Sequence, residues 1–265
     1  MAVLQSLRRV PDAITRNPVL FVPVAGYLLL QLPQFFSGAI SPQLQSALSL
    51  VWSLLTIVLS PFYVGGLFSM VDEALDGDTR LGTFLDGGTG NYVQLLIGYV
   101  ILLVVNGVIG FVIAILAVVG FIVVLGSGGL TDASTVTLVI VAVVGLLVAL
   151  AYLAVNFFLQ FYSQAIVVDG EKAIAAFKHS VSLVRENLLA SFGFVLVRGT
   201  ISVLGAAPLV LVSFVQSPAL RELAAVPQLS TPVLVVLGIV GLLLSALTST
   251  VVVTYGISFY RTIRV

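Results

Sequence analysis

Two chemically versatile side chains are scarce in this sequence. It contains no cysteine and a single histidine, His179. Disulfide bonds, thiolate chemistry and the usual zinc or copper clusters are therefore excluded. We expect no metal and no cofactor. A catalytic triad is not expected either, because no motif supplies His179 with a Ser or Cys partner.

Charge is also scarce, since Asp, Glu, Lys and Arg make up 8% of the 265 residues. Hydrophobic residues make up 60%, and the mean hydropathy is +1.21. A soluble domain carries about 25% charged residues, so most of this surface must face lipid. The formal net charge is zero, which argues against a nucleic-acid partner. Strong use of Arg, Val, Ala and Gly indicates a GC-rich genome, such as that of a halophilic archaeon.

Six apolar blocks are long enough to cross a membrane, because a span needs about 20 apolar residues. The first lies behind several arginines and is longer than a signal-peptide core, so we interpret it as an uncleaved helix. We predict an all-α bundle of six transmembrane helices that forms a single domain over residues 1–265. The predicted spans are Val19–Ile40, Leu44–Val71, Asn91–Gly126, Val136–Val168, Leu188–Gln216 and Pro232–Tyr260.

The basic residues fall mostly on one side of this topology. Arg221 is on the other side, and Arg198 lies inside a span. Cytoplasmic loops are enriched in Lys and Arg, so we predict a plasma-membrane protein with both termini in the cytoplasm. The residues on the predicted cytoplasmic side are Arg8, Arg9, Arg16, Arg80, Lys172, Lys178, Arg185, Arg261 and Arg264.

The chain also contains a possible threefold repeat, with each unit made of an amphipathic segment, an Asn and two spans. The Asn residues are Asn17, Asn91 and Asn187, and we expect their side chains to cap free backbone N–H groups. Because the units share one orientation, their axis would lie along the membrane normal. Each unit ends with a Tyr and, three residues later, a small residue: Tyr63 and Gly66, Tyr162 and Ala165, Tyr255 and Ser258.

The amphipathic segments precede the spans on the cytoplasmic side. In the third and clearest, Phe177, Val181, Val184 and Leu188 share one predicted helix face. The second is short, over Thr79–Asp86. Such helices could contact anionic lipid or a cytoplasmic partner, or they could form a collar that closes the bundle. The collar is favoured, because one or two cations attract lipid by only about 1 kcal/mol each.

Arg198 is the only ionisable residue inside a predicted span. It could form an anion or substrate site, because charged groups within membranes are costly and often functional. The favoured alternative is that it extends toward the head groups or pairs with acidic residues at span ends. The candidate interfacial acidic residues are Asp72, Glu73 and Asp169.

Uncharged polar residues complete the candidate site within the membrane. Asn156, Gln160 and Gln164 recur every four residues and so form a polar stripe, and Asn106 lies in the preceding span. The stripe could line a cavity or bond to neighbouring helices. Packing is favoured, because such interhelical hydrogen bonds are common and contribute about 0.6 kcal/mol each.

The segment from Val168 to Asn187 resembles uncharacterised six-span membrane proteins frequent in haloarchaea. These are similar in turn to the membrane domain of some bacterial glycerophosphodiester phosphodiesterases. The resemblance implies the six-span fold, but no catalytic activity, because the catalytic domain of those enzymes is absent here. The residues that carry it are Asp169, Gly170, Ala176, Ser180, Arg185 and Asn187.

Three functions remain open at this point. The first is a non-enzymatic membrane scaffold or accessory subunit that interacts with lipids and with a protein partner in the membrane. The second is a small transporter or channel with a polar site near Arg198. The third is a membrane-embedded enzyme that would use the acidic residues between Asp72 and Asp78. The sequence favours the first.

Overall fold

A computed structural model describes residues 2–35, 42–126, 134–216 and 230–264, and all regular structure in these ranges is helical. This confirms the all-α prediction. The helices are α1 (Ala2–Arg16), η1 (Pro18–Leu20), α2 (Phe21–Phe35), α3 (Pro42–Ala74), α4 (Leu81–Gly90), α5 (Tyr92–Gly126), α6 (Thr135–Leu159), α7 (Tyr162–Asp169), α8 (Ala173–Glu186), α9 (Leu188–Gln216) and α11 (Thr231–Ile263).

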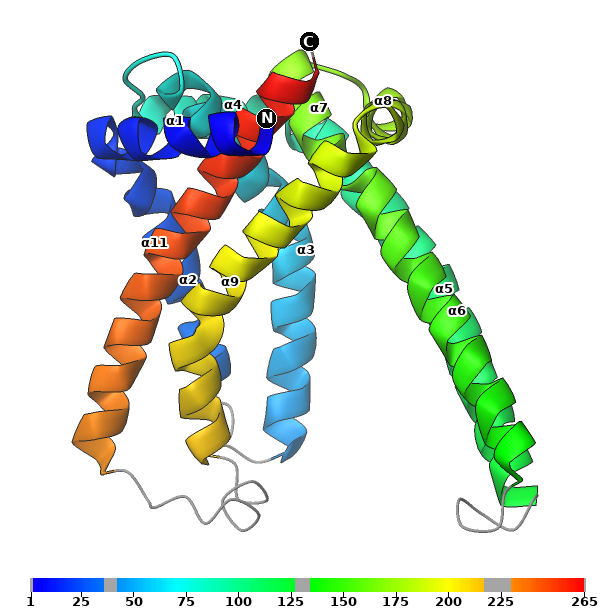
Figure 1. The fold of residues 1–265 in the computed structure, drawn as a ribbon. Helices are drawn as coiled ribbons and strands as arrows, with labels where there is room; N and C mark the ends of the chain where they lie inside the picture. Colours follow the sequence, from blue (N-terminus) through cyan, green and yellow to red (C-terminus); the bar gives the residue numbers. More distant parts are fainter. Residues whose placement is uncertain (1, 36–41, 127–133, 217–229, 265) are drawn as a thin grey trace.

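Five spans within the described residues are long and apolar enough to cross a membrane. A sixth arises if α1 and the helix that follows it are counted as one span, but the chain bends there by 93°. In Figure 1, α1 lies across the ends of the spans and α2 runs alongside them. The first predicted span therefore corresponds to α2, whose predicted last residues, 36–40, lie outside the described ranges.

The fourth predicted span is interrupted, because α6 ends at Leu159 and α7 begins at Tyr162. The hydroxyl of Ser180 lies at the break. It accepts a hydrogen bond from the Phe161 N–H at 3.0 Å and donates one to the Phe158 carbonyl at 2.8 Å. A side chain that enters the backbone ladder in this way breaks or bends a helix.

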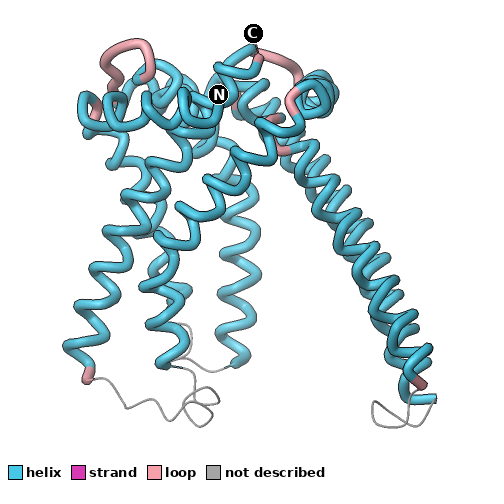
Figure 2. Tube along the Cα trace, in the orientation of Figure 1, coloured by secondary structure: helices cyan, strands magenta, loops and turns pink. Residues whose placement is uncertain are grey.

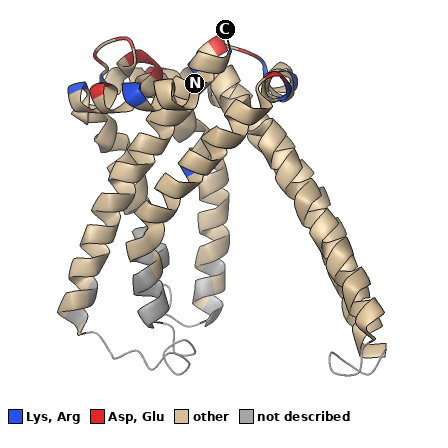
Figure 3. Ribbon diagram, viewed as in Figure 1, with Lys and Arg blue, Asp and Glu red and all other residues tan. Residues whose placement is uncertain are grey.

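Charge gathers at one end of the molecule, where α1, α4 and α8 lie over the ends of the spans (Figures 2 and 3). We call this the charged end: α1, α4, α7, α8 and the last turns of α3 and α11. Among the described residues, Arg198 is the cation that lies away from it, near the middle of α9. Arg221 lies outside the described ranges, so the cytoplasmic assignment of the charged end stays a prediction.

The three repeated Asn residues have one structural role, although not the predicted one. Asn17, Asn91 and Asn187 each follow the last residue of an amphipathic helix. Each amide nitrogen Nδ2 donates to the carbonyl four residues earlier, at 3.0, 3.0 and 3.1 Å respectively. The side chains thus complete the end of the preceding helix, and the expected capping of free N–H groups in the next one is wrong.

The amphipathic helices pack in a cyclic order. The helix of unit 2, α4, packs on α3 of unit 1, and the helix of unit 3, α8, packs on α7 of unit 2. The helix of unit 1, α1, closes the ring on α11 of unit 3. In this last contact Ser258 donates to the Ser6 carbonyl at 3.0 Å. Each helix therefore covers the second span of the unit before it.

The buried faces of α1 and α8 have the same register. In both helices the positions three, four, seven and eleven residues before the Asn are buried, and α8 also buries Ala173, fourteen residues before its Asn. The predicted face of α8 is therefore wrong in its placement. Phe177 and Val181 lie at its margin, and Leu188 is exposed and belongs to α9. The buried residues are Ser6, Val10, Ala13 and Ile14 in α1, and Ala173, Ala176, Ser180, Leu183 and Val184 in α8.

The core lies near the charged end. Phe161, Phe194, Tyr255 and Phe259 are fully buried there, and their rings pack against one another at centroid distances of 4.6–6.2 Å. These rings bring together α9, α11 and the junction of α6 and α7. The favoured collar interpretation agrees with this arrangement, because buried apolar residues of α1 and α8 pack into this core.

Candidate functional site

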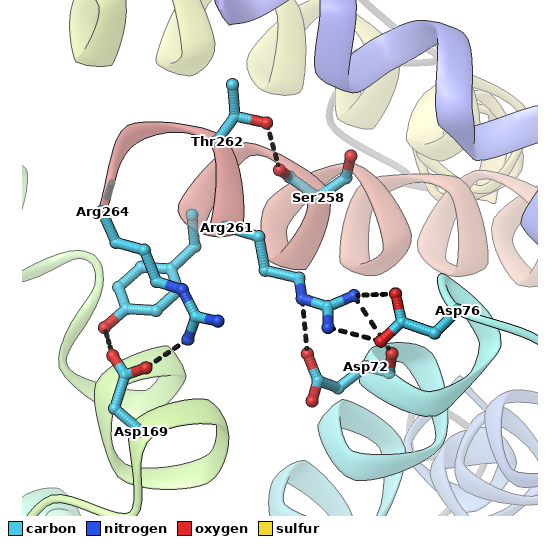
Figure 4. A network of polar contacts seen from close by, with 8 residues as sticks. Asp72, Asp76, Asp169, Ser258, Arg261, Thr262 and Arg264 are labelled. Carbon is cyan, nitrogen blue, oxygen red and sulfur yellow. Dashed lines mark hydrogen bonds and ion pairs between the residues drawn. The ribbon is translucent and has the colours of Figure 1, made fainter.

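Two arginines at the end of α11 join the three units (Figure 4). Arg261 binds both carboxylate oxygens of Asp76, at 3.0 and 2.6 Å, and its Nε lies 3.2 Å from Asp72. Arg264 pairs with Asp169, which also accepts a hydrogen bond from the Tyr260 hydroxyl. The ends of α3, α7 and α11 are thereby tied together. We call these contacts the arginine clamp.

The candidate acidic residues Asp72, Glu73 and Asp169 have different partners. Asp72 and Asp169 are each taken up by a different arginine. Glu73 instead accepts hydrogen bonds from the hydroxyls of Thr79 and Thr83, at 2.7 and 2.5 Å. Glu73 therefore lies outside the clamp, whereas Asp72 and Asp169 both belong to it. A hydrogen bond from the Arg261 guanidinium lowers the pKa of Asp76 below its usual value.

His179 also has a partner at the charged end. Its Nδ1 lies 2.8 Å from Glu171, and both side chains are partly exposed. Nearby, Asn187, Glu186 and Arg264 help to line a polar hollow of about 390 Å³. No group of three or more His, Cys, Asp or Glu side chains within the described ranges is placed to hold a metal ion.

Arg198 lies ten residues into α9, about 15 Å along the helix axis from its first residue. It is exposed, and it makes no hydrogen bond or ion pair with any described residue. The predicted pairing with an acidic residue at a span end is therefore not found. Placing an arginine at the centre of a membrane helix costs about 2.5–3.5 kcal/mol, and no carboxylate in the described ranges offsets that cost.

The remaining candidate polar residues do not gather around Arg198. Asn156 of α6 donates to Asn106 of α5 at 3.5 Å, a weak bond between neighbouring helices. The stripe ends there, because the break after Leu159 separates Gln160 from Gln164. Gln164 is buried in α7, and the Gln160 amide nitrogen is buried without a partner. The favoured packing interpretation fits Asn106 and Asn156.

A cavity that the sequence analysis did not find lies between α2, α3, α9 and α11. Its volume is about 360 Å³. Tyr27 and Tyr63 stack at its edge with ring centroids 4.3 Å apart. We call it the hydroxyl cavity, because six of its lining residues carry hydroxyl groups: Tyr27, Tyr63, Ser202, Ser245, Thr248 and Ser249.

Helical spacing was the signal that could have revealed this cavity. Ser245, Thr248 and Ser249 follow a spacing of three and four residues, so they share a face of α11. Ser202 comes one turn after Arg198 on α9, and both therefore lie on the same face. The arginine clamp has no comparable pattern in the sequence, because Arg261 and Arg264 pair with residues 185 and 95 positions away.

The chain matches one protein family over residues 1–263, and its description is Domain of unknown function (DUF7847). No curated protein and no solved structure gives a significant match. The matched residues include Arg198, the lining of the hydroxyl cavity and all of the arginine clamp except Arg264. The chain, whose described residues include five helices long and apolar enough to cross a membrane, belongs to the DUF7847 family.

Proposed function

We propose that the protein is a non-enzymatic membrane scaffold or accessory subunit that interacts with lipids and holds a membrane partner against the α5–α6 hairpin. One observation carries this proposal. In the most apolar stretch of each span, 39% of the residues are buried in α3, 6% in α5 and none in the span that begins with α6. Of the five candidate spans in the described ranges, the two of the hairpin therefore bury the smallest share of their residues.

The groove between α5 and α6 suits a helix of a protein partner. It has a volume of about 780 Å³. Small residues permit close approach of membrane helices, and four of them line this groove. They are Ala117, Gly120, Gly145 and Ala149. Around them, Val and Leu side chains offer apolar contact. We therefore propose that a transmembrane helix of a different protein occupies the groove between α5 and α6.

Site-directed photo-cross-linking tests the partner, and the absence of native cysteine makes it straightforward. A benzophenone–maleimide label would be attached to Leu146→Cys or Leu147→Cys, both 60% exposed on the hairpin. Leu243→Cys, 66% exposed on α11, is the control. In native membranes we expect one discrete adduct of higher mass from the hairpin positions only. Lipid adducts alone, or only a dimer of this chain, would refute the partner.

A small transporter or channel is the second candidate, and the hydroxyl cavity is the observation that favours it. Polar groups in the middle of a bundle often mark a pathway for a substrate or ion. If water reaches the cavity, Ser249→Cys should react with a membrane-impermeant thiol reagent. Leu150→Cys, 52% exposed on α6, should not react. An unreactive Ser249→Cys would argue against the transporter.

The finer assignments are part of the same proposal. We infer that the charged end faces the cytoplasm of the cell and that the protein lies in the plasma membrane. The positive-inside pattern supports this orientation. Impermeant labelling of Asp78→Cys in intact cells would test it, since a strong signal from outside would reverse the topology. Haloarchaeal origin and likeness to phosphodiesterase membrane domains stay predictions from composition and from the Asp169–Asn187 segment.

A further inference from the structure

Among the described residues, Arg198 has no carboxylate partner, and its surroundings on α9 are apolar. The ion pairs found among the described residues lie at the charged end and involve Arg261, Arg264 and His179. Arg198 lies outside all of them and is exposed on α9. A cation in this position needs an anion from outside the chain, and phospholipid phosphate is the anion that a membrane supplies in quantity.

The neighbours of Arg198 provide hydrogen-bonding groups on one side. Ser202 and Gly205 follow it at four and seven residues, on the same helix face, and both line the hydroxyl cavity. The Ser202 and Ser249 hydroxyls make no hydrogen bond within the described residues, so both are available to a ligand. The Arg198 cation matches the negative charge of a phosphate group, and the hydroxyls can donate hydrogen bonds to its acceptor oxygens.

The cavity can be reached from lipid along one flank. Helices α2, α3 and α9 each pack on α11, and α2 packs on α3, whereas α9 does not pack closely on α2 or α3. The face of α3 that carries Tyr63 continues through Leu59 and Leu55, which are 37% and 41% exposed. Acyl chains could lie along this apolar surface while the head group reaches Arg198.

We propose that Arg198, with Ser202 and the open flank of the hydroxyl cavity, binds the phosphate head group of an anionic phospholipid that enters from the side. This inference rests on the lipid-interacting part of the proposed function. Its site on α9 is separate from the α5–α6 hairpin, and so are its tests. If the wild-type protein retained no anionic phospholipid while the Leu146→Cys cross-link still formed, this inference alone would be refuted.

Lipid retention by the purified full-length protein tests the proposal. Native mass spectrometry would count phosphatidylglycerol and phosphatidylcholine molecules retained after exchange into detergent. We expect the wild type to prefer phosphatidylglycerol. Arg198→Gln should reduce its retention about fivefold, the effect of one cation's attraction to anionic lipid. Arg198→Lys should keep most of the retention, because it keeps the charge.

Two further variants make the test specific. Arg185→Gln removes an exposed cation from α8 and should retain lipid as the wild type does. Ser202→Leu fills the cavity without changing any charge and should also reduce retention, which decides the question if Arg198→Gln does not fold. Unchanged retention in Arg198→Gln would overturn the site, as would an equal loss in Arg185→Gln.

The source of the phosphate is tested separately. Inorganic phosphate added at millimolar concentration should not displace phosphatidylglycerol, because a free dianion gains nothing from the apolar flank. Full displacement would identify a site for a soluble anion and would overturn the lipid assignment.

Discussion

Units 1 and 3 of the repeat form a packed group of four spans, whereas the spans of unit 2 stand apart. Helices α2, α3, α9 and α11 meet around α11. The α5–α6 hairpin joins them near the charged end and diverges from them toward its other end (Figure 1). No residue of α6 is buried. The same sequence plan has thus produced two different packing outcomes.

The difference follows from the side chains that each unit presents. The packed spans α3 and α11 bury small hydroxyl residues, namely Ser60, Ser245, Thr250 and Thr254. Val, Leu and Ile supply 36 of the 60 residues of α5 and α6, and the weak Asn106–Asn156 bond joins the two helices. Lipid is as apolar as leucine, so helices associate in membranes through small and polar residues. Hydrophobicity alone leaves most of the hairpin, beyond its contacts near the charged end, unpacked against the rest of the described residues.

Replacing a buried aromatic residue should give the largest difference in unfolding free energy between the packed core and the hairpin. Phe161→Ala removes a fully buried ring and should lower the free energy of unfolding by about 3–5 kcal/mol. Phe111→Ala, at a 68% exposed position on the hairpin, should change it by less than about 1 kcal/mol. Unfolding of the detergent-solubilised protein by SDS titration measures both. Equal losses would mean that the hairpin also packs inside the chain.

Glycine positions give the next largest effect. A Cβ at Gly66 would lie 2.4 Å from the Phe84 carbonyl oxygen, so Gly66→Ala must push α4 away from α3. We expect a loss of about 1–3 kcal/mol. On the hairpin, a Cβ at Gly110 would meet nothing within 4 Å, and Gly110→Ala should cost nothing. Thermal unfolding followed by circular dichroism compares the two, and a neutral Gly66→Ala would contradict the contact.

The repeated Asn residues should differ between units. Asn17 also donates to the Gly77 carbonyl at 3.0 Å and accepts from the Thr79 N–H at 2.7 Å. Asn17→Ala would leave these groups without partners and should cost about 1–2 kcal/mol. Asn91 bonds only within its own helix end, so Asn91→Ala should cost about 0.5 kcal/mol. The same unfolding measurement ranks them, and the reverse order would be inconsistent with these contacts.

The smallest effect is expected from pH. Arg261 lowers the pKa of Asp76 in the folded protein, so this ion pair adds stability above the unfolded pKa, about 3.9. That stability is lost as the pH falls through the lower folded value. Because Asp76 is exposed, the loss should stay below about 1 kcal/mol.

Asp76→Asn isolates this contribution. Between pH 5 and about pH 3, the variant should lose less stability than the wild type, because its side chain does not titrate. Asp78→Asn removes an exposed carboxylate with no contact to the clamp and serves as the control. The unfolding midpoint across this pH range gives the result. Identical curves for wild type and Asp76→Asn would exclude a contribution from the pair.

The sequence predicted the spans well because each is a local property of composition. The predicted Asn91–Gly126 appears as Tyr92–Gly126, and Leu188–Gln216 is reproduced at both ends. The break before Tyr162 was not predictable, because the hydroxyl that causes it lies 19 residues beyond Phe161 in the chain. Local patterns do not carry contacts of that kind.

The candidate site likewise has features that are predictable from local sequence and features that depend on contacts between distant segments. Arg198 was identified from a single rule, the cost of charge in a membrane, and it is indeed unpaired within the described residues. The hydroxyl cavity depends on four helices from two units meeting, which no single segment encodes. The face of α8 was misplaced because small residues, Ala173, Ala176 and Ser180, pack more closely than the larger Phe177 and Val181.

The cyclic packing at the charged end has a consequence for biosynthesis. Helix α1 is made before α11, on which its packing surface lies, and the Ser258–Ser6 bond joins residues 252 positions apart. At about 5–20 residues per second, a ribosome needs roughly 13–50 seconds to make the residues in between. During that time the apolar face of α1 has only the membrane surface to cover it. Helix α1 is thus synthesised well before the helix on which it mainly packs.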